Sequence, residues 1–275
     1  MIKAFVDSTI LTDALIKSGE SKKCAIEVLK KFDITELPVF AIKEFKAGPL
    51  KNFVWMHNKL VSVRSYEKAL EALQHMSMTP RRYTTSTALE ALKEAAGSIS
   101  KKTPANFAAK YGDKAAIDKI LCDEFRLAIK TAIMKAWKKR RKITTDIVFP
   151  LPCYHEVSPY EKRGLIEIDP KRCDPSGECS LASLLRDKLD EMWKMREAIK
   201  GSAKLENQRR SKTLRQLYRK PKERIQESEC QNLGDAIYVL LSPSDSVIIT
   251  TNITDYKPLV EAIGKMAKSP KEILV

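Results

Sequence analysis

The feature that most constrains the fold is a pair of short apolar segments at opposite ends of the chain. Met1–Val6 alternates apolar side chains and stops at an acidic residue, and Val247–Thr251 is a β-branched run between polar residues. Both are predicted strands, and a third is expected at Ile273–Val275. Helical patterns separate them. Because strands that alternate with helices form parallel sheets, we predict an α/β fold whose central sheet needs both termini.

The middle of the chain differs from the two ends in its charge. Of the 50 Lys and Arg residues, 35 lie within residues 65–225, which carry nearly all of the net charge of +15. Residues 149–179 interrupt a helical pattern with several prolines and glycines and are predicted to be loop or short strand. We therefore expect a core made of residues 1–64 and 226–275, with a basic, mainly helical insertion at 65–225.

Charge and composition narrow the classes of partner. A positive charge of this size favours phosphate-rich partners such as nucleic acid, although an acidic protein or a membrane surface would also be complementary. No apolar run is long enough to cross a bilayer, and the first residues lack the basic leader of a signal peptide. We therefore expect a cytoplasmic protein without a membrane partner. Nine glycines and 7% aromatic residues argue against a β-sandwich or a propeller.

Four short segments, two near each end, carry acidic residues in strand or helix contexts that fit together. They are Phe5–Leu11, Glu44–Gly48, Gly234–Ile237 and Ile249–Tyr256. The second begins inside a predicted helix, Val39–Lys46, that should stop at Gly48-Pro49. In this order the four segments resemble the motifs of the PIN family of nucleases, over about residues 1–60 and 226–275. The resemblance implies a three-layer core around a parallel sheet, enlarged here by the insertion.

The resemblance also implies a set of acids that organise catalytic metal: Asp7, Glu44, Asp235 and Asp255. Three further residues are expected to hydrogen-bond around them: Ser8, Thr250 and Asn252. The chemistry agrees, because ligands of a parallel sheet gather beyond the carboxyl ends of its strands, and converging carboxylates repel one another unless cations neutralise them. Oxygen ligands without nearby His or Cys suit Mg²⁺ or Mn²⁺.

Each of these acids also has a simpler interpretation. The three aspartates stand where aspartate commonly caps a helix, as Ser8 is also expected to do, and Glu44 could lie on a solvated helix face. Asn252 occupies a position that is often acidic in the family. The sequence therefore leaves open whether Asn252 or Asp255 faces the metal.

A second set of metal-ligand residue types lies in the irregular segment: Cys153, His155, Cys173 and Cys179. Four such ligands could hold a structural Zn²⁺ where a core is missing. Their spacing departs from common zinc motifs. Ordinary reduced cysteines are therefore the favoured interpretation for these residues and for the other cysteines of the chain.

The longest basic stretch, Lys194–Arg224, is called the basic arm below. It contains 12 Lys or Arg residues against three Glu, too few acids for helical pairing to neutralise it. We expect it to contact nucleic-acid phosphates through Arg209, Arg210, Lys212, Arg215, Arg219 and Lys220, with Tyr218 available to stack on a base. The alternative is an ordinary solvated helix face.

Together these features predict a Mg²⁺- or Mn²⁺-dependent nuclease. The family resemblance favours an endoribonuclease acting on RNA rather than DNA, with a toxin-like or defence role and an inhibitory protein or larger complex as partner. Two other classes stay open. One is a non-catalytic RNA-binding protein that keeps a PIN-like fold. The sign of it in the sequence would be Asn252, at a position where the family often has an acid. The other is an interaction module whose basic arm binds an acidic partner.

Overall fold

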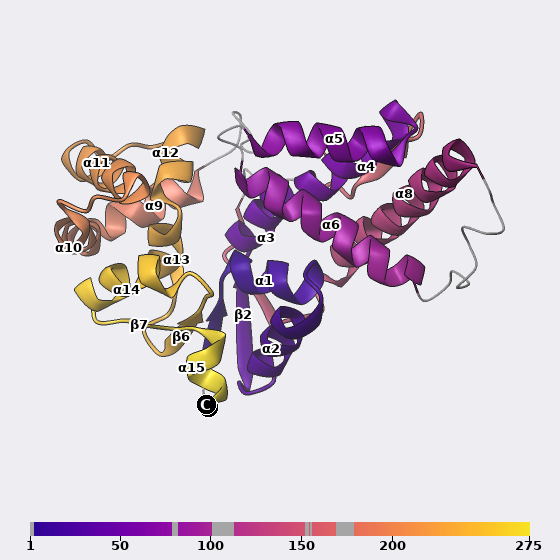
Figure 1. The fold of residues 1–275 in the computed structure, drawn as a ribbon. Coiled ribbons are helices and arrows are strands. Elements are labelled where there is room, and N and C mark those ends of the chain that lie inside the picture. Colours follow the sequence, from indigo (N-terminus) through magenta and orange to yellow (C-terminus); the bar gives the residue numbers. More distant parts are fainter. Residues whose placement is uncertain (1–2, 79–81, 101–112, 152–153, 155, 169–178) are drawn as a thin grey trace.

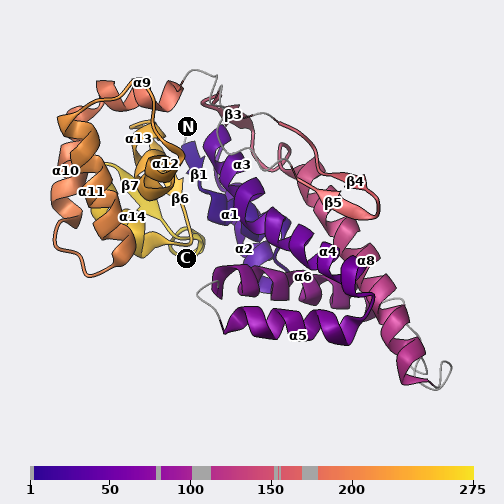
Figure 2. The same ribbon diagram turned by 90° about the horizontal axis from the view of Figure 1, so that it is seen from above.

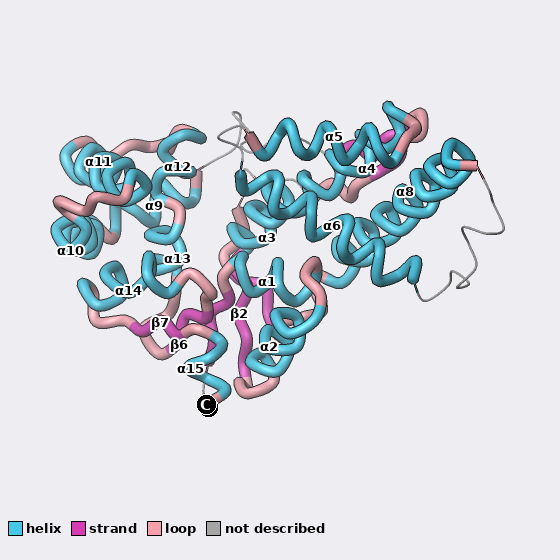
Figure 3. The backbone as a smooth tube through the Cα atoms, viewed as in Figure 1, coloured by secondary structure: helices cyan, strands magenta, loops and turns pink. Residues whose placement is uncertain are grey.

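The computed structural model describes residues 3–78, 82–100, 113–151, 154, 156–168 and 179–275 (Figure 1). Figure 3 shows most of the strands in the lower part of the molecule, with helices beside and above them, and a further short pair of strands near the top. None of the described helices has the length and apolar character needed to span a bilayer.

A parallel sheet of five strands forms the centre of the fold, in the order β3-β2-β1-β6-β7. The strands are β1 (Lys3–Val6), β2 (Ile34–Pro38), β3 (Asp146–Val148), β6 (Ser246–Ile249) and β7 (Met266–Lys268). The central strand β1 pairs with β2 on one side and with β6 on the other, 240 residues further along the chain. The predicted α/β fold, with a parallel sheet that needs both termini, is confirmed.

Helices from the two ends of the chain pack beside this sheet (Figures 1 and 2). The N-terminal region supplies α1 (Ser8–Leu15), α2 (Gly19–Leu29) and α3 (Val39–Phe45). The C-terminal region supplies α13 (Asp235–Leu241), α14 (Ile253–Ala262) and α15 (Pro270–Leu274). Large aromatic side chains from several of these elements are fully buried, among them Phe5, Phe45, Tyr238 and Tyr256. They tie the first and last parts of the chain into one core.

The chain between α3 and α13 forms two helical groups (Figure 1). One group comprises α4 (Lys51–Val63), α5 (Tyr66–Ser77), α6 (Arg82–Ser100) and α8 (Lys114–Lys139). The other comprises α9 (Ser180–Asp187), α10 (Leu189–Ile199), α11 (Leu205–Arg219) and α12 (Glu227–Leu233), and it packs against α14. A small hairpin of β4 (Tyr160–Lys162) and β5 (Leu165–Glu167) rests on α4. Because β3 also belongs to the middle, the boundaries at 64 and 226 do not separate the sheet from an insertion.

The helix containing Glu44 does not stop at Gly48-Pro49, as the sequence suggested. A π-helical turn, Lys46–Leu50, joins α3 directly to α4. The wider turn places Pro49 just before α4, in a stretch where the missing N–H of proline costs little. The chain therefore enters the first helical group without a loop.

The last element is a helix rather than the expected strand at Ile273–Val275. Ser269 accepts a hydrogen bond from the Glu272 backbone, Glu272 bonds back to Ser269, and Pro270 occupies the first turn of α15. These start signals outweigh the short apolar end of the chain. The fifth strand is β7 instead, which precedes this helix.

Candidate active site

The four acids that the sequence singled out come from four separate elements and interact at the carboxyl edge of the sheet. Asp7 directly follows β1, and Asp255 lies in the first turn of α14, just after β6. Glu44 lies in α3, and Asp235 is the first residue of α13. The charge of Asp7 raises the pKa of both Glu44 and Asp235, and that of Asp255 raises the pKa of Asp235. The four carboxylates therefore form one electrostatic cluster, called the acid cluster below.

Asp7 is buried at 2% exposure and is held by hydroxyl groups. Its Oδ2 accepts hydrogen bonds from Thr250 Oγ1 at 2.7 Å and Thr9 Oγ1 at 2.8 Å. Burial raises the pKa of this carboxyl, and the hydroxyl donors oppose the rise. Asp7 occupies the position before α1, but its side chain makes no capping bond, and Ser8 is already inside the helix. Helix capping therefore explains neither residue.

Ser8 links Asp7 to Glu44. Its hydroxyl lies 2.9 Å from Glu44 Oε2 and 3.3 Å from Asp7 Oδ1. The same Glu44 oxygen accepts a hydrogen bond from the Tyr238 hydroxyl at 2.7 Å. Burial, followed by repulsion from Asp7, raises the pKa of Glu44 from its ordinary value of 4.5 to about 8. Glu44 thus faces the acid cluster rather than solvent, and near neutral pH it holds a proton in this metal-free arrangement.

Asp235 is paired with a buried cation from the basic arm. Arg210 Nη2 lies 2.7 Å from Asp235 Oδ2. Burial raises the pKa of Asp235 to about 6, opposed by Arg210 and assisted by the charges of Asp7 and Asp255. Gly234 precedes the helix with a φ of +44°, and a Cβ there would lie 3.5 Å from Arg210 Nη2. A contact at that distance is ordinary, so it is the positive φ, and not the neighbouring arginine, that favours glycine here.

Arg210 is buried, although the sequence predicted that it contacts nucleic-acid phosphates. It is 5% exposed, and besides Asp235 it donates to the Leu233 carbonyl at 3.0 Å and to Asn207 Oδ1 at 2.9 Å. The sequence did contain a sign of this position. Arg210 shares the buried stripe of α11 with Leu214 and Leu217, at helical spacing. Its guanidinium therefore joins Asp235 to Asn207 and Leu233 inside the protein and does not face solvent.

Asp255 is paired with a second cation of the basic arm. Lys204 Nζ lies 2.6 Å from Asp255 Oδ1. Burial raises the pKa of Asp255, but the Lys204 ammonium and a hydrogen bond from Asn252 outweigh it, and the pKa lies below its ordinary value. Asn252 precedes α14, and its backbone N–H donates to Thr250 Oγ1 at 3.0 Å. Of Asn252 and Asp255, only Asp255 has a charged side chain, and its charge contributes to the raised pKa of Asp235.

The donor chemistry of the acid cluster suits a hard divalent cation. All its donors are oxygens. Burial, and after it repulsion between the acids, raises the pKa of Glu44 and Asp235, and a bound cation would offset both effects. Across the described residues, no three His, Cys, Asp or Glu side chains are already gathered closely enough to hold a metal ion. Two of the acids are instead neutralised by Arg210 and Lys204, which a metal ion would have to displace.

The other cationic candidates of the basic arm are exposed. They are Arg209, Lys212, Arg215, Arg219 and Lys220. Within the described part of the chain, none of them forms an ion pair with an acidic side chain. Lys212, Arg215 and Arg219 follow one another at helical spacing on one face of α11. Tyr218 is packed against Trp193, with ring centroids 4.8 Å apart, and is 37% exposed.

Three of the four candidate zinc ligands, Cys153, His155 and Cys173, lie outside the described residues. The fourth, Cys179, precedes α9 as a half-buried free thiol. Cys24, Cys122 and Cys230 are free thiols as well. The zinc site therefore stays a prediction.

The raised pKa values make the metal-free protein sensitive to pH. The native Glu44 carboxyl, with a pKa of about 8 against 4.5, binds its proton more tightly than the unfolded chain does. Its contribution to stability is full below about pH 4.5 and is lost as the pH rises through about 8. In chelator, urea unfolding should show a free energy that falls between pH 5 and pH 8. Glu44→Gln should flatten this fall, whereas Glu27→Gln on the exposed face of α2 should not. An equal fall in all three proteins would contradict the coupling.

Comparisons with known proteins add no relative: no protein-family model, no curated protein and no solved structure matches this chain. The class that the fold defines is an α/β protein with a five-stranded parallel sheet. The resemblance of the four acidic segments to PIN motifs therefore stays a prediction from the sequence.

Proposed function

We propose that this protein is a Mg²⁺- or Mn²⁺-dependent endoribonuclease of the PIN type. The observation that carries the proposal is the acid cluster at the carboxyl edge of the sheet, where ligands of parallel α/β folds bind. After burial, the charges of neighbouring acids in this cluster raise the pKa of Glu44 and of Asp235 there. Proteins rarely bring carboxylates together without a cation to bind, because the mutual repulsion destabilises the fold.

The acids would share the work of holding the metal. Asp7, Glu44 and Asp235 are the principal ligands in this proposal, with Asp255 as the fourth. A bound divalent ion polarises the scissile phosphate and lowers the pKa of a water ligand. The hydroxyl groups of Thr9, Thr250, Ser8 and Tyr238 fix the carboxylate orientations through the hydrogen bonds described above.

A polyanionic substrate is supported by what lies next to the acid cluster. The basic arm presents exposed cations on α11, and the same arm reaches the acids through Arg210 and Lys204. An arm that contacts backbone phosphates would bring a nucleic-acid strand close to the metal ligands. The resemblance of the four acidic segments to PIN motifs favours RNA over DNA, and a toxin-like or defence role belongs to the same resemblance.

Cleavage of labelled RNA and DNA by the purified protein tests the proposal, in Mg²⁺, in Mn²⁺ and in chelator. We expect internal cleavage of RNA that requires a divalent ion. RNA that is bound but left intact under all three conditions would favour the non-catalytic RNA-binding alternative. A protein that neither cleaves nor binds RNA would favour the interaction module.

Binding by the arm can be tested separately from cleavage. Lys212→Ala/Arg215→Ala should weaken binding to many RNA sequences alike and reduce the slope of log Kd against log salt concentration by about two, because each cation that contacts a phosphate releases about one counterion. Lys119→Ala/Lys138→Ala on α8 removes the same charge from exposed positions and should leave the slope near that of the unmodified protein. Fluorescence anisotropy over a salt series measures both. An unchanged slope in the α11 variant would show that this face does not hold the nucleic acid.

A further inference from the structure

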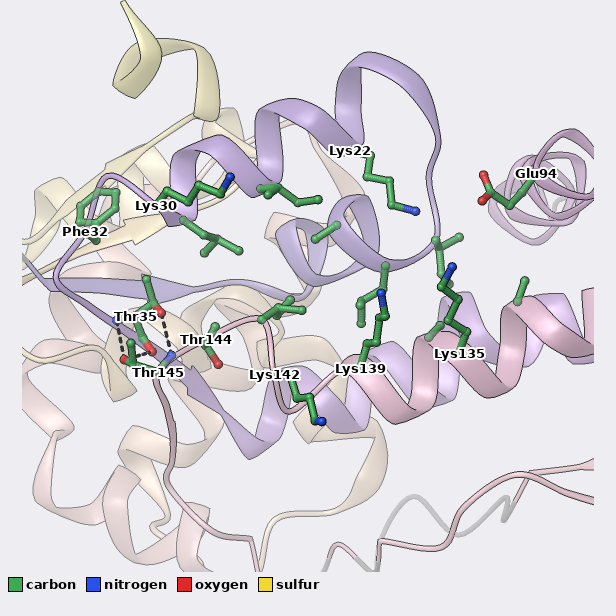
Figure 4. Close-up of a pocket in the computed structure, with 18 of the residues that line it drawn as sticks. Lys22, Lys30, Phe32, Thr35, Glu94, Lys135, Lys139, Lys142, Thr144 and Thr145 are labelled. Atoms are coloured by element: carbon green, nitrogen blue, oxygen red, sulfur yellow. Dashed lines mark hydrogen bonds between the residues drawn. The ribbon is translucent and has the colours of Figure 1, made fainter. Parts of the chain in front are cut away.

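A recess lies at the edge of the sheet opposite the acid cluster. It is bordered by Thr35, near the start of β2, and by Thr145, just before β3, whereas the acid cluster lies beyond the carboxyl ends of the strands. The end of α1, most of α2 and the C-terminal half of α8 form its walls (Figure 4). Its volume of about 730 Å³ falls in the range of small-molecule sites, about 300–1,000 Å³.

The interior of this recess is apolar. Side chains from three elements and their loops line it: Leu15, Ile16, Ile26, Leu29, Phe32 and Ile143. Ile26 is 40% exposed although it belongs to this lining, so apolar surface is presented to whatever enters. Burying that surface would stabilise a complex by about 25 cal/mol per Å². A ligand of the recess should therefore have an apolar body.

The rim of the recess is cationic on both sides. Five lysines line it: Lys22 on α2 and Lys30 just after it, Lys135 and Lys139 on α8, and Lys142 beyond α8. Glu94 is the single acid among the lining residues, and within the described part of the chain none of the five lysines forms an ion pair with an acid. Figure 4 shows the ends of Lys22, Lys135 and Lys139 directed into the space between α2 and α8.

Two threonines of the recess already hydrogen-bond to each other. The Thr35 backbone N–H donates to Thr145 Oγ1 at 2.9 Å, and the Thr145 backbone N–H donates to Thr35 Oγ1 at 2.9 Å. The lysines are therefore the groups left to fix a ligand's orientation, and they select negative charge. The lining holds aliphatic side chains and two phenylalanines rather than a row of aromatic platforms, which disfavours stacked bases.

We propose that the lysine-rimmed recess binds a soluble anionic amphiphile, a single apolar chain that ends in a carboxylate or a similar anionic group. The chain occupies the apolar interior, and the head group lies between α2 and α8 among the lysine ammonium groups. Five uncompensated like charges repel one another, and an anion between them relieves that repulsion. The site is remote from the acid cluster and does not depend on nuclease activity.

Calorimetric titration with decanoate, below its micelle concentration, tests the proposal. We expect saturable binding of one decanoate per chain, weaker binding of 1-decanol, and none of acetate. Lys135→Glu/Lys139→Glu should weaken decanoate binding at least about tenfold, which corresponds to about 1.4 kcal/mol. Lys138→Glu is the matched control, because Lys138 is exposed on the same helix but does not line the recess. Ala132→Trp, which keeps every lysine and fills the interior, should abolish binding.

Three results would overturn the proposal. Acetate that binds as tightly as decanoate would show a surface that recognises charge alone. Decanoate affinity unchanged by both Lys135→Glu/Lys139→Glu and Ala132→Trp would place the ligand elsewhere. Binding to vesicles of anionic phospholipid, without binding of free decanoate, would assign the lysines to a membrane surface. Asp7→Asn separates this site from the proposed nuclease, since it should abolish cleavage and leave decanoate binding unchanged.

Discussion

Asp7→Asn is expected to reduce RNA cleavage by about a thousandfold or more, without unfolding the protein. The substitution removes the charge of the carboxylate that is coupled to both Glu44 and Asp235, and about a thousandfold corresponds to about 4 kcal/mol of transition-state free energy. Asparagine keeps an oxygen that can accept the hydrogen bonds of Thr250 and Thr9, so the fold should persist. Single-turnover cleavage and thermal unfolding measure the two effects.

Asp13→Asn is the matched control for this variant. Asp13 lies in the adjacent helix α1 and is buried too. Burial, and to a smaller extent the charge of Asp7, raises its pKa, but its carboxylate forms an ion pair with Lys17. It should retain cleavage activity. Equal activity of the Asp7 variant and the unmodified protein would remove Asp7 from the catalytic set, and loss of activity in both variants would point to a general structural effect.

Arg210→Ala is expected to have the largest effect on stability, a loss of about 3 kcal/mol. The change leaves the Asp235 carboxylate without its cation and the Leu233 carbonyl without its donor, and it opens a void beside Leu214. Arg209→Ala, at the exposed neighbouring position, should change stability by less than about 0.5 kcal/mol. Urea denaturation at neutral pH in chelator compares the two.

The double variant Arg210→Ala/Asp235→Asn shows whether the loss comes from the unpaired acid. It should be more stable than the sum of the two single changes predicts, because each change then removes the partner that the other leaves unpaired. Strict additivity would indicate that Arg210 acts through packing and its bond to Leu233 alone. In either case, Arg209→Ala measures the effect on stability of removing one exposed charge from the same helix.

The predictable part of the fold lies at the two ends of the chain. β1 and β6 carry alternating or β-branched apolar residues, and that local signal sufficed to predict a parallel sheet built from both termini. β3 and β7 are three residues each, too short for a periodic signal. Their pairing is decided by contacts with distant strands, which a local pattern does not contain.

The same division applies to the acid cluster. The acids and the supporting Ser8 and Thr250 were predicted because they belong to short segments with a recognisable order. Tyr238, Thr9 and Lys204 were not, because their roles depend on residues far away in the chain: Tyr238 donates to Glu44 and Lys204 pairs with Asp255. Arg210 was predicted to face solvent, since charge dominates the composition of its helix and obscures the apolar stripe to which it belongs.

In the proposed nuclease, the ion pairs between the basic arm and the acid cluster link metal binding to nucleic-acid binding. A divalent ion held by Asp235 and Asp255 would displace Arg210 and Lys204 from these acids. Arg210 is buried, but Lys204 is exposed and would become available to a phosphodiester strand. Carboxylate and phosphate would thus compete for Lys204. By thermodynamic linkage, nucleic acid should tighten metal binding by the same factor by which metal tightens nucleic-acid binding.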